Sequence, residues 1–322
     1  MAAGRSIAVV GAGLMGHGIA QVFACAGRSV AIHDPDAAAL ASVPARIRAN
    51  LELLGRDPAP ADAVVLAGSL EEALAGAGFV FEAAPEKLPL KQALFARLDQ
   101  LAGTETILAS NTSVLAIGEL ARGTSDPGRI VGTHWWNPPY LVPLVEVVQA
   151  DTTRRETVER TMALLADVGK SPVHVRRDIP GFVGNRLQHA LWREAIALVG
   201  AGVCDAETLD LVVKDGFGLR LPVLGPLENA DLVGLDLTLA IHEYLLPSLD
   251  RTPGPAPILR EKVAHGELGM KTGRGFRRWD ATEAQQVRER LVRHLAGLAR
   301  EKEKEKDQLR QEQSDQRLEE GT

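Results

Sequence analysis

Short apolar runs alternate with longer stretches of helical periodicity through the first half of the chain. Strands of this length, separated by helical stretches, are typical of βαβ units and a parallel sheet. The runs are Ile7–Val10, Val30–His33, Phe79–Phe81, Ile107–Ala109, Ile130–Gly132 and Leu144–Val148. We therefore expect an α/β fold that begins with a doubly wound, Rossmann-type domain over residues 1–177.

The pattern changes at Asp178–Gly181, where adjacent Pro and Gly indicate a turn. From Phe182 onward the apolar positions follow helical spacing, and no convincing strand pattern remains. We expect an all-helical C-terminal domain over residues 178–300. Its last helix should begin near Asp280 and Glu283, which have capping-box spacing. The apolar face of that helix comprises Val287, Leu291, Leu295 and Leu298.

The end of the chain, residues 301–322, consists almost entirely of Lys, Glu, Arg, Gln and Asp. Charge alternates strictly from Glu301 to Lys306. Such a composition offers too little apolar surface to join a core. We expect a solvated helix extension or a disordered tail, with a partner-binding element as the less favoured alternative.

Composition narrows the class of protein. The 322 residues suit about two domains, and 45% of them are hydrophobic, so a sizeable core can form. A net charge of −6 disfavours nucleic acid or an anionic membrane as the main partner. No apolar run reaches the ~18 residues that span a bilayer, and a strand at Ser6 leaves no room for a leader, so we expect a cytoplasmic protein.

Cys25 and Cys204 lie outside any CxxC spacing, and we expect reduced core residues without a bound metal.

A glycine-rich turn, Gly11-Ala12-Gly13-Leu14-Met15-Gly16, follows the first expected strand and opens a helix. In this context the GxGxxG spacing predicts a dinucleotide site. Gly11 permits the tight turn, Gly13 lets the backbone approach a diphosphate, and Gly16 lets the helix pack against the strand. Free amides at the helix N-terminus would hold the diphosphate. The cofactor contacts expected from this turn are Gly11, Gly13, Leu14, Met15 and Gly16.

Asp34 ends the second expected strand, 23 residues after Gly11. A carboxylate there can accept both hydroxyls of an adenosine ribose and would repel a 2′-phosphate. Neither Pro35 nor Asp36 supplies a compensating positive charge. The sequence therefore favours NAD over NADP. FAD uses the same fingerprint and stays a competitor at this point, and a glycine-rich turn without a ligand is the structural alternative.

His134 is the histidine best placed for chemistry. Oxidation of an alcohol needs a base for the hydroxyl proton, and imidazole suits neutral pH. His134 follows the strand Ile130–Gly132, at the carboxyl end where open α/β sheets place their ligands. Glu146 lies inside the next apolar strand, where a carboxylate is costly without a partner. Pairing with His134 would remove that cost, whereas a purely structural histidine remains the competing interpretation.

Several motifs of the chain resemble those of the 3-hydroxyacyl-CoA dehydrogenase family, over nearly the whole length. They are Val10–Gly16, Ser110–Ser113, Gly132–Pro138, Leu144–Val148, Pro180–Arg186, Gly225–Glu228 and Gly269–Phe276. Each motif alone is a weak signal, but together they are highly specific for this family.

The resemblance implies roles for individual residues. His134 is implied as the catalytic base, and Glu146 as the residue that orients it and stabilises its charged form. Ser113 and Asn185 are implied as hydrogen-bond partners of the reacting oxygen and the histidine, with Asn137 helping to hold the site. From the residues alone, Ser113 could instead cap the following helix, and Asn185 could satisfy a buried turn.

The resemblance also concerns the cofactor side and the assembly. The Glu82 and Lys87–Lys91 region matches the family's cofactor-side loop, so Glu82 and Lys91 are expected cofactor contacts. The helical domain would serve substrate binding and pair with its copy to give a homodimer, with a role in fatty acid metabolism. An apolar stripe in this domain is more typical of a monomer core than of an interface. The stripe comprises Leu187, Leu191, Ile196 and Val199.

Two departures from the family pattern bear on the substrate. Familiar members carry two phenylalanines after the histidine, whereas this chain has Trp135 and Trp136, whose larger rings could reduce the pocket they are expected to line. The span 46–91, where the family meets CoA, holds five basic residues against seven acidic ones. That balance makes a poor phosphate-binding surface.

Three hypotheses follow from the sequence. The leading one is NAD-dependent oxidation of the 3-hydroxyl of an L-3-hydroxyacyl substrate. The second is the same chemistry on a small free hydroxy acid, because Tyr140–Glu146 resembles relatives that act on L-gulonate or L-carnitine. The third, from another class, is a non-catalytic NAD-binding structural protein, which would have no need of His134, Glu146, Ser113 and Asn185 together.

Overall fold

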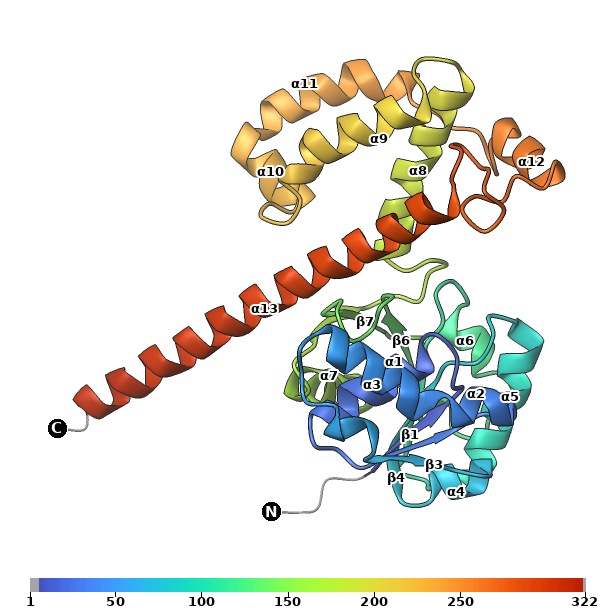
Figure 1. Ribbon diagram of the computed structural model, residues 1–322, viewed down its shortest axis with the longest axis vertical. Coiled ribbons are helices and arrows are strands. Elements are labelled where there is room, and N and C mark those ends of the chain that lie inside the picture. Colours follow the sequence, from blue (N-terminus) through green and yellow to red (C-terminus); the bar gives the residue numbers. More distant parts are fainter. Residues whose placement is uncertain (1–5, 321–322) are drawn as a thin grey trace. The chain divides into compact units, whose positions relative to one another are not determined.

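One mixed sheet organises the first part of the chain. The computed structural model describes residues 6–320 (Figure 1). Within them eight strands follow the order β3-β2-β1-β4-β5-β6-β7-β8. Neighbours run parallel except β6 and β7, which are antiparallel. The strands are β1 (Ser6–Val10), β2 (Val30–His33), β3 (Val64–Leu66), β4 (Ala77–Glu82), β5 (Ile107–Ser110), β6 (Ile130–Trp135), β7 (Leu144–Val148) and β8 (Ser171–Val175).

Helices cover both faces of this sheet, and each face has its own core. Successive side chains of a strand point to opposite faces, so Ile7 and Val9 of β1 join one core while Ala8 and Val10 join the other. The first core includes α1 (Gly16–Cys25), α3 (Val43–Leu53) and α7 (Arg155–Asp167), and the second α4 (Leu70–Leu74), α5 (Leu88–Leu101) and α6 (Ile117–Leu120). The remaining elements here are α2 (Ala37–Ala41), η1 (Ala59–Ala61) and η2 (Pro127–Arg129). The expected doubly wound fold is confirmed.

All six expected strands are present, and the sequence missed two. Strand β3 is apolar in sequence, but it has only three residues, of which only Val64 is buried, so its run is shorter than the ~4–8 residues by which a buried strand is recognised. Strand β8 lies at the sheet edge and is largely exposed, with Pro172 in its second position. Edge strands tolerate proline and polar residues because one side forms no ladder.

The second half of the chain is helical, as expected. From Phe182 on, the described residues contain isolated bridges but no strand. The chain divides into two units, one ending at Asn185 and joined by residues from Arg293 onward, the other spanning Arg186–Val292. The helices of this second half of the chain are α8 (Gly184–Gly200), α9 (Ala206–Asp215), η3 (Phe217–Leu219), α10 (Pro226–Val233), α11 (Leu235–Leu245), η4 (Leu246–Ser248), α12 (Pro257–Ala264) and α13 (Ala281–Glu320).

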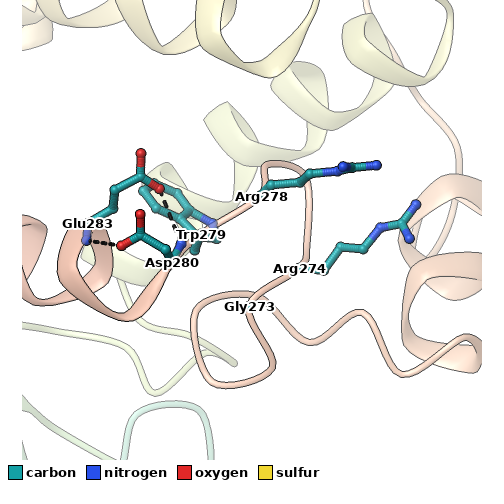
Figure 2. Close-up of a pocket in the computed structure, with 6 residues that line it drawn as sticks. All are labelled: Gly273, Arg274, Arg278, Trp279, Asp280 and Glu283. Atoms are coloured by element: carbon teal, nitrogen blue, oxygen red, sulfur yellow. Dashed lines mark hydrogen bonds between the residues drawn. The ribbon is translucent and has the colours of Figure 1, made fainter.

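The expected capping box opens α13. Glu283 N donates to Asp280 Oδ1 over 2.7 Å, and Asp280 N donates to Glu283 Oε2 over 3.2 Å. Figure 2 shows these two side chains at a hollow of about 580 Å³ that Gly273, Arg274, Arg278 and Trp279 also line. Both carboxylates are used for capping, and the hollow lies wholly within the helical unit. Residues 301–320 of the expected charged end belong to helix α13. Residues 321–322 lie outside the residues that the structure describes.

Two expectations about burial are wrong. Both cysteines are free, as expected, but Cys25 is exposed and Cys204 is half-buried, so neither is a core residue. Cys25 is the last residue of α1, where the helix leaves the sheet. The stripe on α8 is not a monomer core either, because Leu187 and Leu191 are 59% and 39% exposed in this chain.

Candidate active site

The glycine turn between β1 and α1 leaves an open surface at the helix N-terminus. Gly11 has φ +106°, and a Cβ there would lie 2.7 Å from Ala83 O. At Gly16 a Cβ would lie 1.7 Å from Gly11 O. These two glycines are therefore required by the packing of the chain itself. A Cβ at Gly13 would meet nothing within 4 Å, and no side chain caps the first turn of α1. The turn thus offers free amides and room for an approaching diphosphate.

Asp34 joins the end of β2 to this turn. Its Oδ2 accepts a hydrogen bond from Ala12 N over 2.6 Å, and its Oδ1 accepts one from Asp36 N over 2.8 Å. Each carboxylate oxygen has a second lone pair, so the group can still accept hydroxyls of a ribose. Asp36 is itself occupied with the first turn of α2. The negative charge at this position fits NAD, as the sequence suggested.

Glu82 and Lys91 form a buried ion pair behind the turn. Both side chains have no exposed surface, and Lys91 Nζ donates to the two carboxylate oxygens over 2.7 and 2.9 Å. Ser110 Oγ and Ala84 N also donate to Glu82. In this conformation neither side chain can contact a bound cofactor, which corrects the expectation for both. They instead hold the ends of β4 and β5 together with α5.

Glu86 is a residue that sequence reasoning missed. Its Oε1 accepts hydrogen bonds from Thr112 Oγ1, from Ser113 N over 2.9 Å and from Val114 N. Burial acts to raise the pKa of Glu86, but these bonds and the nearby charge of Lys91 outweigh it and lower the pKa. Glu86 thereby fixes the loop that carries Ser113. Its only sequence signal was its place after β4, beside the matched lysine region.

His134 and Glu146 lie opposite each other on the antiparallel pair β6–β7. His134 Nδ1 is 2.7 Å from Glu146 Oε2, and both side chains are buried. The other oxygen of Glu146 accepts from Val183 N over 2.9 Å and Gly184 N over 3.0 Å. Burial acts to raise the pKa of Glu146, but the bonds from His134 and the two amides outweigh it and lower the pKa. An ionised Glu146 requires the proton on Nδ1, which leaves the lone pair on Nε2.

The turn before α8 encloses this pair. Phe182, a buried residue with φ 50°, packs its ring 5.8 Å from that of His134, and Trp136 packs at 5.0 Å. At Gly184 a Cβ would lie 2.5 Å from Trp136 Cζ2 and 3.3 Å from Glu146 Oε2. Only glycine fits there, so the turn brings two backbone amides directly onto the carboxylate. The sequence had singled out the motif but not this contact.

Ser113 and Asn185 lie next to each other. Asn185 Nδ2 donates to Ser113 O over 2.9 Å, and Ser113 itself is exposed. The preceding Asn111 accepts from Trp135 N over 3.1 Å, which ties the same loop to β6. The loop after β5 therefore lies at the strand end that carries His134.

The two tryptophans have different surroundings. Trp135 is buried in the core, with its ring 6.1 Å from Phe23 and 5.9 Å from Phe81, so the expected substrate contact for it is wrong. Because neighbours on a strand face opposite sides, His134 and Trp135 cannot line one pocket. Trp136 does pack against the histidine. Asn137 is exposed and lines a cavity of about 370 Å³ together with Leu14, His17, Arg46, Ala49, Asn50, Pro138 and Tyr140.

No group of three or more His, Cys, Asp or Glu side chains in the described part of the chain is arranged to hold a metal ion. No helix in the same part of the chain is both long and apolar enough to cross a membrane.

Comparison with known proteins matches both halves of the chain. A model of the 3-hydroxyacyl-CoA dehydrogenase NAD binding domain matches residues 6–179, and a model of that family's C-terminal domain matches residues 181–279. The chain is 34% identical to 5-formyl-3-hydroxy-2-methylpyridine 4-carboxylate 5-dehydrogenase of Mesorhizobium japonicum, over 92% of this chain and 97% of the relative. It is 41% identical to a probable 3-hydroxybutyryl-CoA dehydrogenase of Bacillus subtilis, over 84% and 96%.

Further relatives and a solved structure agree. An L-carnitine dehydrogenase of Streptomyces griseus is 42% identical, over 71% of this chain and 70% of the relative. A crystal structure of the pyridine carboxylate dehydrogenase, described as an NAD⁺-dependent dismutase, superposes with a TM-score of 0.86 at 33% identity, covering 92% and 97% of the two chains.

The open glycine turn, Asp34 and the doubly wound sheet define a dinucleotide-dependent dehydrogenase. The chain belongs to the 3-hydroxyacyl-CoA dehydrogenase family, and its cofactor is NAD. The resemblance seen in the sequence is thereby confirmed, and FAD is no longer a competitor.

Proposed function

We propose that the protein oxidises the hydroxyl of a short 3-hydroxy substrate to the 3-oxo compound with NAD, reversibly. The observation that carries this proposal is the 2.7 Å contact between His134 Nδ1 and Glu146 Oε2 at a strand end. That contact leaves His134 Nε2 as the base for a hydroxyl proton. A non-catalytic NAD-binding protein has no use for a buried base with a buried carboxylate behind it.

The chemistry divides between the chain and its cofactor. When bound, NAD supplies the acceptor for the hydride that leaves the carbinol carbon. His134 Nε2 takes the hydroxyl proton, and Glu146 stabilises the imidazolium that results. We assign Ser113 and Asn185, which meet at Ser113 O, to binding of the reacting oxygen. We assign the diphosphate to the turn Gly11–Gly16 and the adenosine ribose to Asp34.

Three of the five basic residues in the span 46–91 are already engaged. Arg46 donates to Ala12 O over 2.8 Å, Arg48 pairs with Asp62 over 2.6 Å, and Lys91 is buried against Glu82. Each would have to give up its partner to bind a phosphate. This favours a substrate that does not depend on CoA phosphates for binding.

A CoA thioester is the second candidate. The matched family is named for such substrates, and the Bacillus subtilis relative bears a 3-hydroxybutyryl-CoA name. The pyridine carboxylate and carnitine relatives are named for substrates without CoA. The names of the relatives thus support both candidates. We prefer a substrate without CoA because Arg46 and Arg48 already have partners.

A panel assay tests the proposal. Formation or loss of NADH absorbance would be followed with L-carnitine, L-gulonate, L-3-hydroxybutyryl-CoA, free acetoacetate and acetoacetyl-CoA. We expect kcat/KM for acetoacetyl-CoA and its N-acetylcysteamine analogue to differ only modestly. A preference for the CoA ester above ~10³-fold, worth about 4 kcal/mol, that weakens with salt would establish the second candidate. NADH binding without turnover of any member would instead favour the non-catalytic protein.

We also propose a homodimer formed by the unit Arg186–Val292. Helices α8 to α12 contain no buried residue, and Tyr244, Leu227 and Val223 are 89%, 80% and 79% exposed. Apolar surface of this extent marks an interface. Light scattering should give twice the chain mass of 34.5 kDa. Leu227→Asp should shift the protein toward a monomer, whereas Leu53→Asp, at a 65% exposed site of the other unit, should not. A monomeric parent would contradict the proposal.

A further inference from the structure

The loop 138–143 connects the strands that carry the His134–Glu146 pair. One side of it, at Pro138 and Tyr140, lines the 370 Å³ cavity beside the glycine turn. The loop contains three prolines, which lack the N–H needed for ladder hydrogen bonds. Its own bonds are limited to those from Leu141 N and Val142 N to Pro138 O, both over 3.0 Å. Its shape therefore depends on contacts from other elements.

Helix α1 presses against one side of this loop. A Cβ at Gly18 would lie 2.6 Å from Pro139 Cγ and 3.3 Å from Tyr140 Cδ1. Glycine inside a helix is otherwise unfavourable, and Gly18 is not part of the GxGxxG turn. The close approach of the loop therefore explains why position 18 has a glycine.

Lys170 holds the loop from the opposite direction. It lies between α7 and β8, and its ammonium donates to Pro139 O and, over 3.0 Å, to Val142 O. The ammonium also lies 5.5 Å from the centre of the Trp135 ring, a cation–π contact. The next residue, Ser171, donates its N–H to Pro143 O over 2.9 Å. Two of the loop's carbonyls thus depend on one side chain.

The charge of Lys170 is balanced by dipoles and not by a carboxylate. In the described part of the chain no acidic side chain pairs with it. Lys170 lines a second cavity, of about 740 Å³. Asp167 lines that cavity too, but its carboxylate pairs with Arg28. Burial lowers the pKa of Lys170 to about 8. A partly buried cation without an anionic partner is costly, so its presence calls for a role that offsets the cost.

The other titratable groups that face this cavity do not ionise with the lysine. Burial raises the pKa of Tyr140 in the loop. Partial desolvation of the thiol raises the pKa of Cys25 on α1, although that residue is exposed overall. Arg56, which follows α3, has an interaction partner of its own. Helix α13 contributes only apolar groups, from Leu295, Leu298 and Ala299.

We propose that Lys170 is a positioning residue for the dehydrogenase reaction, because its ammonium holds the loop 138–143 in the shape that forms the substrate-side wall of the 370 Å³ cavity. The proposal rests on the function proposed above. Deprotonation leaves a neutral amine that is a weaker donor to Pro139 O and Val142 O, and removal of the amine releases both carbonyls. The wall then moves away from the substrate while the glycine turn keeps the cofactor.

The test compares Lys170→Met and Lys170→Arg with the parent chain. Arg155→Met, which removes a positive charge at an 88% exposed site of α7 in the same unit as Lys170, is the control. At pH 7 we expect Lys170→Met to raise KM for L-3-hydroxybutyryl-CoA or L-carnitine by about 10-fold or more, with a smaller effect on kcat, as for a misplaced binding wall. The Kd of NADH should be unchanged. Lys170→Arg should retain most of the parent's affinity.

The pH profile and hydrogen exchange separate positioning from a general structural role. In the oxidation direction, KM of the parent should rise above about pH 8, the pKa of Lys170, whereas that of Lys170→Arg should stay flat because arginine remains charged. Exchange at the amides of Tyr140, Leu141 and Val142 should be faster in Lys170→Met than in the parent at the same pH. The parent should also become faster than Lys170→Arg once both are measured above about pH 8.

Two results would overturn the proposal. One is unchanged exchange at residues 140–142 in Lys170→Met. The other is an alkaline rise of KM that persists unaltered in Lys170→Arg. If the parent turns over neither substrate, the proposed function fails at that step, and the exchange measurement still decides whether Lys170 holds the loop.

Discussion

Removing the charge of Glu146 should disable the base without disturbing the fold. In Glu146→Gln the amide oxygen can still accept from Val183 N and Gly184 N, now 2.9 and 3.0 Å from Oε1. The amide nitrogen then faces His134 Nδ1 and requires a lone pair there. The imidazole must move its proton to Nε2, which is the wrong tautomer for a base.

The size of the effect follows from the geometry. An imidazolium and a carboxylate 2.7 Å apart attract each other by about 6 kcal/mol at an effective dielectric constant of about 20. Desolvation of the pair offsets part of this gross figure. A loss of about 10²–10⁴ in kcat corresponds to ~3–5 kcal/mol, which lies within that bound.

The assay is the initial rate of NADH formation, together with NADH binding. His134→Ala should lose a similar factor, and the double variant should lose little more than either single one, because the two residues act as a unit. Glu159→Gln, an exposed change on α7, serves as the control. NADH affinity should survive in all variants. Losses that simply multiply in the double variant, or full kcat in Glu146→Gln, would refute the dyad.

The remaining predictions concern the cofactor, the charged end and the lysine. Asp34→Ala should weaken NAD use and raise relative activity with NADP, since repulsion of a 2′-phosphate is gone; an unchanged ratio of the two kcat/KM values would remove Asp34 from this role. Deleting residues 301–322 should leave melting temperature, oligomeric state and activity nearly unchanged; a large fall in melting temperature would show that the segment packs. Burial lowers the folded-state pKa of Lys170 to about 8, against about 10.4 when unfolded. Between these values the unfolded chain binds more protons, so the stability of the parent relative to Lys170→Met should increase with pH across that window; a difference in the denaturation free energy that is flat or falls would contradict this.

Apolar runs predicted six of the eight described strands because these six supply most of the buried positions of the sheet. The same logic missed β3, whose apolar run is only three residues long, and β8, an exposed edge strand that contains Pro172 and His174. His134 and Glu146 were predictable as a pair, since a carboxylate inside an apolar strand needs a partner. Trp135 was misplaced, although strand alternation alone puts it on the face opposite His134.

Other parts of the site depend on contacts that only folding creates. The amides of Val183 and Gly184 reach Glu146 through a backbone turn, and backbone groups are the same at every position of a sequence. Lys91 looked like a cofactor contact, but its burial against Glu82 is decided by how α5 packs on β4. Glu86 likewise gains its role from a loop 26 residues further along the chain.

The antiparallel junction of β6 and β7 makes loop length a determinant of catalysis. His134 faces Glu146 only because the chain between them spans the correct number of residues for this register. Inserting or deleting one residue between Asn137 and Pro143 invites a slip that turns every side chain of β7 to the other face of the sheet. The carboxylate would then enter the core on the far face, and the strand would have to lose either its apolar packing or its charge. Substitutions in this loop can therefore be tolerated far more readily than changes in its length, and natural or designed variants should diverge in residue type here while keeping the count.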